Sequence, residues 1–261
     1  MSDKLIKINK IFGDFSQSYS DVLNIGYFQT EDGVEISTDN IYFMQQIHTD
    51  DVVVLEDILE NKTVLLKNNT LPNCDGVITA ISGVYLAVRT ADCFPLLVYD
   101  STKNVIAAVH SGRDSTKLKI IQMIIQIMIK RFQCNPIDIK IEIGAGICEN
   151  CYEVSDDIAL DYYRIGDFQS PPCTDGVPPS KYINGETPLV QSNRLNLKKN
   201  IIDTALSNGI LSTNITSNDI CTYESKQHFS FRRGDIDPRQ LSLIGMSKST
   251  QPVGNAFIRS V

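Results

Sequence analysis

Residues 76–111 read GVITAISGVYLAVRTADCFPLLVYDSTKNVIAAVHS. Short runs of apolar, often β-branched residues are separated in this stretch by turn residues. The pattern predicts four β-strands that follow one another closely, at Val77–Ala80, Tyr85–Arg89, Leu96–Tyr99 and Val105–Val109. We therefore expect the fold to be organised around a sheet that is built from the middle of the chain.

The segments that follow this stretch add a helix and a further strand. A helix is predicted at about Ser115–Phe132, since Asp114 or Ser115 can cap its start and Lys130 and Arg131 suit its negative end. Residues 137–143 alternate strictly between isoleucine and charged residues, which is typical of a half-buried strand.

The remaining elements set the fold class. A second helix is predicted at Asn196–Ser207, where Gly209 follows its end. Strands and helices mixed in this order predict an α+β (mixed α/β) fold, with mixed β-sheets flanked by helices, in a single domain over residues 1–261. Gln169–Pro188 contains five prolines and is predicted to be a long loop within that domain, because helices and central strands exclude such a density.

Composition narrows the classes of partner. The 261 residues are 42% hydrophobic and 21% charged, with a net charge of −7. An acidic surface repels phosphate backbones and anionic lipids, so we expect no nucleic acid and no membrane as partner. No stretch reaches the roughly 18 apolar residues of a membrane helix, and the first residues are too polar for a signal peptide. A cytoplasmic protein is therefore expected, and a small anion in a local basic pocket remains compatible with this charge.

His48, Cys93 and His110 are the candidate catalytic and metal-binding residues. The chain has only three histidines. Two of them, His48 and His110, lie beside predicted strands, and so does Cys93. Side chains at strand ends lie at the rim of a sheet, where catalytic groups collect. If the three side chains converge, two imidazoles and one thiolate form a set that Zn²⁺ accepts, with a fourth position left for water or substrate. Spacing alone does not show that they converge.

The other histidine and cysteines call for simpler interpretations. His228 is expected to be a hydrogen-bonded structural residue. The seven cysteines are an odd number in a large chain, so a disulfide scaffold is not expected and most should be small buried residues. Cys148 and Cys151 form a C-x-x-C motif, but no second pair with suitable spacing accompanies it, which argues against metal or redox work there.

Five sequence blocks carry a resemblance to a known family. They are QQIHTDDVVVL, DGVITAISGVYLAVRTADCFPLLVYD, VIAAVHSG, IGAGICENCYEV and CTYESKQHFSFRRGDIDPRQLSLIG, with SQSYSDVLNIG as a weaker match. The chain resembles the laccase-like polyphenol oxidoreductase family, whose members include zinc-dependent purine nucleoside phosphorylases with adenosine deaminase activity. The resemblance extends over most of the chain, from about Phe12 to Met246.

This resemblance implies an enzyme, a transferase that uses small molecules as partners. It places the ligands of a zinc ion on His48, Cys93 and His110, and it implies one domain of mixed sheets. The implied reaction is phosphate-dependent cleavage of purine nucleosides such as adenosine, inosine or methylthioadenosine. Zinc could also activate water for hydrolytic deamination of adenosine.

The implied reaction suggests which side chains bind phosphate and which transfer a proton. Candidates to bind phosphate are the arginines near the matching blocks, because guanidinium groups pair with phosphate oxygens: Arg232, Arg233, Arg113 and Arg239. Asp92 and Glu153 are candidates for the acid that moves a proton.

The sequence also departs from the family pattern. The family usually continues its second histidine block as H-A-G-W-R-G or H-A-G-W-K-G, whereas this chain has Ser111-Gly112-Arg113-Asp114-Ser115 and no tryptophan. Near Arg239, Asp237 and Pro238 replace the usual threonine and glycine. Both changes concern substrate binding more than metal binding.

Three other functions can be considered, and two of them stay open. A single copper ion would also accept two histidines and a cysteine, although three histidines are too few for a multicopper oxidase. A metal-free hydrolase could use Cys93 as nucleophile and His110 as base on an amide or a cell-wall peptide precursor. A structural zinc protein is disfavoured, because structural sites are closed by four ligands.

Overall fold

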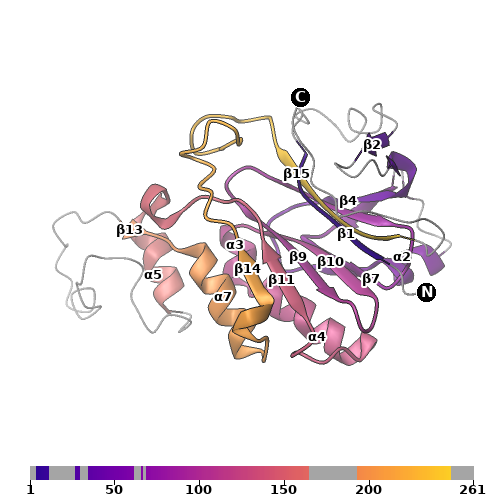
Figure 1. Cartoon of the computed structure of the whole chain (residues 1–261). Coiled ribbons are helices and arrows are strands. Elements are labelled where there is room, and N and C mark those ends of the chain that lie inside the picture. The colour runs from indigo at the N-terminus through magenta and orange to yellow at the C-terminus, as the bar shows by residue number, and fades with distance from the viewer. Residues whose placement is uncertain are drawn as a thin grey trace.

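The computed structural model describes residues 4–11, 27–29, 35–61, 66, 69–164 and 193–247 (Figure 1). The expected proline-rich loop at 169–188 and the block SQSYSDVLNIG lie outside the described residues. Two larger sheets, two small two-stranded sheets and a group of helices make up this part of the chain. The expected α+β class with mixed sheets is confirmed.

The first large sheet has five strands in the order β1-β15-β8-β4-β6. Its outer pairs differ in direction: β1 and β8 run antiparallel to β15, whereas β4 runs parallel to β8 and to β6. The strands are β1 (Lys4–Ile11), β15 (Gln240–Ser247), β8 (Tyr85–Thr90), β4 (Ile41–Gln45) and β6 (Thr70–Asn73).

The second large sheet has six strands in the order β14-β11-β9-β10-β7-β5. Its central strands β11, β9, β10 and β7 are antiparallel, and its edge strands β14 and β5 are parallel to their neighbours. The strands are β14 (Ile215–Ser217), β11 (Lys140–Ile143), β9 (Phe94–Asp100), β10 (Val105–Ser111), β7 (Gly76–Thr79) and β5 (Val52–Val54).

Smaller elements complete the fold. The small sheets pair β2 (Tyr27–Gln29) with β3 (Glu35–Ser37), and β12 (Glu153–Val154) with β13 (Asn193–Arg194). The helices are α2 (Leu55–Glu60), α3 (Arg113–Lys117), α4 (Ile120–Phe132), α5 (Asp156–Arg164) and α7 (Leu197–Ser207), with the 3₁₀ turns η1 (Thr38–Asn40), η3 (Glu149–Cys151) and η4 (Ser212–Asn214). Among these described helices, none has the length and apolar character needed to cross a bilayer.

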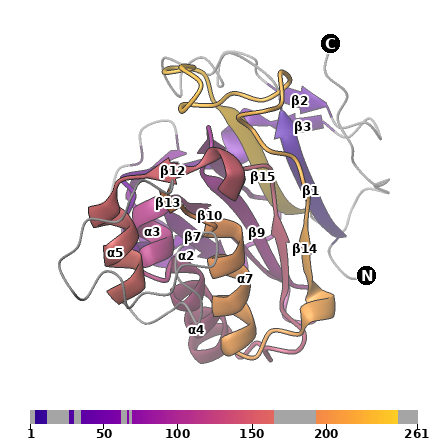
Figure 2. The same cartoon turned by 90° about the vertical axis from the view of Figure 1, so that its left-hand side faces the viewer.

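The fold has three layers, in which the six-stranded sheet lies between the five-stranded sheet and a layer of helices. Alternate residues of β9 and β10 point to opposite faces: Val98 and Ala107 pack toward α4 and α7, whereas Leu97 and Ile106 pack toward the five-stranded sheet. Figure 2 shows α3, α4 and α7 together on one side of these strands, with β15 and β1 on the other. Burial on both faces explains why the central residues of these two strands, 96–98 and 105–109, are all apolar.

The predicted elements agree with the structure except at two places. The expected single helix at Ser115–Phe132 is wrong: α3 and α4 are separate, because Lys119 adopts a left-handed backbone with φ of 62°. The expected strand at 137–143 begins only at Lys140, and Ile137 is 50% exposed in the turn before it. The helix at Asn196–Ser207 is confirmed as α7, which Asn196 caps by accepting a hydrogen bond from the amide of Lys199.

Strand pairing brings distant loops to one edge of the two sheets. In the register of β10, His110 lies opposite Pro95 at the start of β9, and Val109 lies opposite Gly76 at the start of β7. In the other sheet Thr90, at the end of β8, pairs with Gln240 at the start of β15. The loops that enter and leave these strands therefore meet at a common rim.

A pair of neighbouring residues on α4 tests the packing between helix and sheet. Ile124 is 0% exposed against the sheet, whereas Met123 is 38% exposed. We expect Ile124→Ala to lower the free energy of unfolding by about 2–5 kcal/mol, since it loses apolar contacts and leaves a cavity. Met123→Ala, the control, should change it by only about 0.5 kcal/mol. Urea denaturation of both variants is the measurement, and equal midpoints would contradict this packing.

Candidate active site and metal centre

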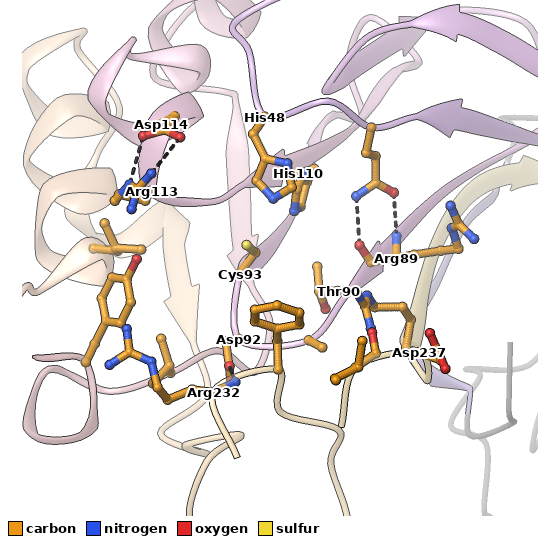
Figure 3. A pocket seen from close by; sticks show the side chains of 18 residues that line it. His48, Arg89, Thr90, Asp92, Cys93, His110, Arg113, Asp114, Arg232 and Asp237 are labelled. Atoms are coloured by element: carbon orange, nitrogen blue, oxygen red, sulfur yellow. Dashed lines mark hydrogen bonds and ion pairs between the residues drawn. The ribbon is translucent and has the colours of Figure 1, made fainter. Parts of the chain in front are cut away.

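A cavity of about 620 Å³ opens at the common rim of the two sheets. Figure 3 shows how side chains from separate loops point into it. They come from the segments 46–48, 89–93, 110–114, 147–152 and 231–239, with Leu197 from α7. A cavity of this size suits a small-molecule ligand.

His48, Cys93 and His110 converge at this cavity. Their ligand atoms all lie within 4.8 Å of one another, and the rings of the two histidines meet edge to face with centroids 4.7 Å apart. Figure 3 shows the sulfur of Cys93 below both rings. The structure thus brings together the three residues that the sequence nominated.

Gly112 lies against this cluster and leaves room for it. A Cβ atom at Gly112 would lie 2.8 Å from the sulfur of Cys93 and 3.1 Å from Cδ2 of His48. The first distance is too short for unbonded atoms, so any larger residue would displace a member of the cluster. The glycine in the block VIAAVHSG is therefore required by the site and not by the strand.

Asp75 positions two of the three residues. Its Oδ1 lies 2.7 Å from Nδ1 of His110, while Oδ2 accepts hydrogen bonds from the backbone amides of Ile47 and Thr49 on either side of His48. Those two bonds hold His48 in a left-handed backbone with φ of 64°, which costs about 1–3 kcal/mol in a residue other than glycine. With Nδ1 of His110 occupied, its Nε2 is the nitrogen that remains for a metal.

The charges of the cluster follow from its burial. Burial alone would raise the pKa of Asp75, but hydrogen bonds from His110 and from the backbone of Thr49 and Ile47 lower it below its ordinary value. Burial lowers the pKa of His110 in spite of its bond to Asp75. Burial, and then the charge of Asp92, raise the pKa of Cys93 to about 12. The lowered pKa of His110 favours the neutral imidazole that a metal needs, while the thiol of Cys93 needs a cation nearby to lose its proton.

The donor set fits a metal with a preference for nitrogen and sulfur. Two imidazoles and one thiolate are ligands of Zn²⁺, and three protein ligands are the number found in catalytic zinc sites. The carboxylate of Asp75 behind His110 matches the support that metal-binding histidines usually have. His48, Cys93 and His110 are therefore the residues that could hold the ion.

Asp92 lines the cavity but its carboxylate is already engaged. Oδ1 accepts a hydrogen bond from the hydroxyl of Thr222 at 2.7 Å, and Oδ2 accepts one from the amide of Arg232 at 2.7 Å. The backbone oxygen of Asp92 also accepts the amide of Ile147. This residue joins three loops of the cavity wall. Glu153, the other acid nominated from the sequence, is exposed and is not among the cavity-lining residues.

The two adjacent arginines have different surroundings. Arg232 lines the cavity, where its guanidinium lies over the ring of Tyr152 and donates to the backbone oxygen of Glu153. Arg233 is not among the lining residues; its guanidinium binds Asp235 and the backbone oxygens of residues 222, 223, 225 and 228. The expectation that Arg233 contacts phosphate does not fit this geometry, because its donors hold the loop together.

Arg113 and Arg239 also line the cavity, each with a local partner. Arg113 donates twice to the carboxylate of Asp114, at 2.9 and 3.1 Å. Arg239 donates to the backbone oxygens of Ile236 and Pro238, and its guanidinium lies 6.0 Å from the ring centre of Phe231. Both guanidinium groups keep further N–H donors that could meet an anion.

Sequence reasoning missed several residues of the site. The sequence signal for a functional role of Asp75 is weak, because an aspartate directly before a buried strand belongs to no metal-binding motif. Tyr152 and Phe231, which were not nominated from the sequence, line the cavity. Their rings supply aromatic surfaces in a chain that lacks the family's tryptophan. Gln46 forms a paired hydrogen bond with the backbone of Arg89, at 2.7 and 2.9 Å, and so joins the loop of His48 to the end of β8. The structural role predicted for His228 is confirmed: it is buried and lies 2.8 Å from the hydroxyl of Ser225.

Fold and site together define an α+β protein with a histidine–cysteine cluster that could hold a metal ion at the rim of mixed sheets. The chain belongs to the family described as multi-copper polyphenol oxidoreductase laccase, which matches residues 23–247. The resemblance drawn from the sequence blocks is thereby confirmed.

Relatives with names and a solved structure support this membership. A protein of Campylobacter jejuni named purine nucleoside phosphorylase is 28% identical over 203 residues, which cover 77% of this chain and 75% of that protein. A protein of Streptomyces coelicolor with the same name is 29% identical over 193 residues, or 74% and 69% of the two chains. The crystal structure of the Bacillus licheniformis hypothetical protein YfiH matches with a TM-score of 0.67 and 27% identity, over 81% of this chain and 76% of that one.

The role of Asp75 can be tested by metal binding. We expect Asp75→Asn to weaken zinc binding by about 10–100-fold, because the uncharged amide orients His110 less firmly and no longer favours a bound cation. Competition with a chromogenic chelator measures the affinity. Asp51→Asn is the matched control, since Asp51 contacts the hydroxyl of Thr49 in the same loop but no imidazole. Equal affinities in both variants would contradict the role given to Asp75.

Proposed function

We propose that this protein is a purine nucleoside phosphorylase that carries Zn²⁺ on His48, Cys93 and His110. The observation that supports it best is the convergence of these residues in a cavity lined by arginine and aromatic side chains. The names of the relatives in Campylobacter jejuni and Streptomyces coelicolor point to the same reaction. The substrates would be a purine nucleoside and inorganic phosphate.

The reaction sets clear demands on the cavity. An oxygen of phosphate bonds to the anomeric carbon of the ribose as the bond from that carbon to the purine nitrogen breaks. The electron pair of that bond leaves with the base, which takes up a proton, and ribose 1-phosphate is the other product. The transition state carries positive charge on the sugar beside an anion, so charged groups that are fixed before substrate binds lower its free energy.

Charged and aromatic side chains of the cavity fit these demands. Arg232, Arg113 and Arg239 present guanidinium groups, which pair well with phosphate oxygens. The rings of Tyr152 and Phe231 offer flat apolar surfaces to a purine, and Phe231 is 58% exposed and so accessible. Asp92 also lines the cavity, but the hydrogen bonds to both of its carboxylate oxygens hold the side chain in one orientation.

Zinc would polarise a substrate oxygen or nitrogen, or activate a water molecule, at the mouth of this cavity. The metal-free hydrolase alternative needs the thiolate of Cys93 as its nucleophile. A thiol whose pKa is raised to about 12 is protonated near neutral pH and is a poor nucleophile. This favours a metal-bound Cys93. The single-copper alternative is distinguished by colour, because a blue-copper site absorbs strongly and zinc does not.

Product analysis tests the reaction. We expect zinc-loaded protein to release free purine base from adenosine, inosine or methylthioadenosine only when phosphate is present, with ribose 1-phosphate as co-product. Arsenate should replace phosphate in base release, and Cys93→Ser should lower the rate at least about 100-fold. Base release that is equal without an anion would mean hydrolysis, and inosine formed from adenosine would mean deamination. No product from any nucleoside would overturn the proposal.

The adjacent arginines give a matched pair for the phosphate site. Arg232→Ala should raise KM for phosphate about tenfold or more with little change in KM for the nucleoside, because a guanidinium–phosphate pair is lost. Arg233→Ala should instead lower the melting temperature by several degrees, since the loop at 222–235 loses its internal hydrogen bonds. Initial rates over a grid of both substrates and a thermal scan measure this. Unchanged phosphate dependence in Arg232→Ala would move the phosphate site toward Arg113 or Arg239.

A further inference from the structure

A second group of metal-binding side chains lies outside the cavity. The ligand atoms of Cys148, Cys151, Cys221 and Glu224 all lie within 4.8 Å of one another, and none of these residues lines the cavity. The sequence alone does not predict this group, because no second pair with suitable spacing accompanies Cys148 and Cys151. The missing half of the set comes from a loop more than 60 residues later.

Two turns of the same spacing face each other in this group. Cys148 caps the start of the 3₁₀ turn η3 and Cys151 is its last residue, and the amide of Cys151 donates to the backbone oxygen of Cys148 at 3.1 Å. Cys221 and Glu224 are likewise three residues apart, in a turn closed by a bond from the amide of Ser225 to the oxygen of Cys221 at 2.9 Å. The C-x-x-C spacing is typical of zinc turns, and here C-x-x-E provides the opposite half.

The backbone holds the two turns in register. Gly146 forms a β-bridge with Cys221, and the amide of Thr222 donates to the oxygen of Gly146 at 3.1 Å. The amide of Cys148 donates to the sulfur of Cys221 at 3.3 Å. Amide donors directed at sulfur stabilise a thiolate and are common around metal-bound cysteines. The sulfur atoms are thus placed by main-chain contacts and not by chance proximity of flexible side chains.

The geometry points to a structural zinc site formed by Cys148, Cys151, Cys221 and Glu224. Three thiolates and one carboxylate supply four ligands, the number that closes a tetrahedral structural site, whereas the cavity cluster offers three. A disulfide would use only two of the three sulfur atoms and would leave no purpose for Glu224, whose carboxylate lies 3.5 Å from the sulfur of Cys151. This inference does not depend on the reaction proposed above.

The position of the site indicates that it would stabilise the cavity wall. It would join the turn at 148–151 to the turn at 221–224, and both turns lead into the wall of the cavity. Thr222 binds the carboxylate of Asp92, and Ile147 binds its backbone oxygen. Arg233 ties the backbone oxygens of the second turn to the segment at 228–235. A metal here would brace the loops that carry Arg232 and Tyr152 without contacting substrate.

Cobalt substitution tests the site independently of catalysis. The full-length chain with Cys93→Ser keeps no cysteine in the cavity cluster, so any thiolate-to-cobalt charge-transfer absorption must arise elsewhere. We expect this chain to bind about one equivalent of Co²⁺ with that absorption and with the strong visible bands of a tetrahedral ion. Adding Cys148→Ser and Cys151→Ser should abolish the charge-transfer bands. Cys134→Ser, at a buried cysteine that belongs to neither cluster, is the matched control and should keep them.

Glu224→Gln keeps the proposal testable if the cysteine variants fail to fold, because Glu224 is exposed. In the Cys93→Ser chain it should retain thiolate absorption but weaken Co²⁺ binding at least about tenfold. Folded, fully reduced Cys93→Ser protein that shows no thiolate-to-cobalt absorption would overturn the site. A Cys148–Cys151 disulfide found by mass spectrometry in protein purified without reductant would overturn it in favour of a redox pair.

Discussion

The hydrogen bond between the buried carboxylate of Asp75 and His110 is the contact on which the geometry of the cavity depends. Asp75 directly precedes β7 and His110 is the last residue but one of β10, and the antiparallel pairing of these strands sets the 2.7 Å contact. The same carboxylate holds the loop of His48 through two backbone amides. A slip of one residue between β7 and β10 would turn His110 to the opposite face of the sheet. The ladder of apolar side chains on both faces makes such a slip costly, so core packing and metal geometry are linked.

The middle of the chain could be predicted because its strands are buried on both faces. Continuous apolar runs at β9 and β10 are visible in the sequence, and turn residues separate them. The break between α3 and α4 was not visible, because lysine is an ordinary helix residue and nothing in the local sequence signals the left-handed backbone of Lys119. The alternation that predicted a strand at Ile137 was misleading for a related reason, since this isoleucine lies in an exposed turn.

The candidate site was predictable where rare residues carried the signal. His48, Cys93 and His110 could be chosen because the chain has so few histidines and these lie beside strands. Asp75 could not be chosen, since its importance arises only when β7 lies beside β10. Cys221 was hidden for a similar reason: its link to the C-x-x-C motif is a β-bridge between loops that are distant in the chain. Contacts made by chain pairing leave no local pattern for sequence reasoning to find.

The segment after His110 contains residues that are fixed against the cluster of His48, Cys93 and His110 and residues that only face the cavity. Gly112 has no room for a side chain, and its amide donates to the hydroxyl of Ser115, which in turn donates to the backbone oxygen of His110. These contacts fix the path of the chain at the cluster. Arg113 and Asp114, between the fixed positions, pair with each other and are partly exposed at the cavity. This charged pair stands where the family pattern given above has tryptophan and a basic residue, so it changes the polarity of one wall while His48, Cys93 and His110, the residues proposed to hold the ion, keep their places. A substrate preference that differs from that of the relatives is therefore compatible with the same three candidate metal ligands.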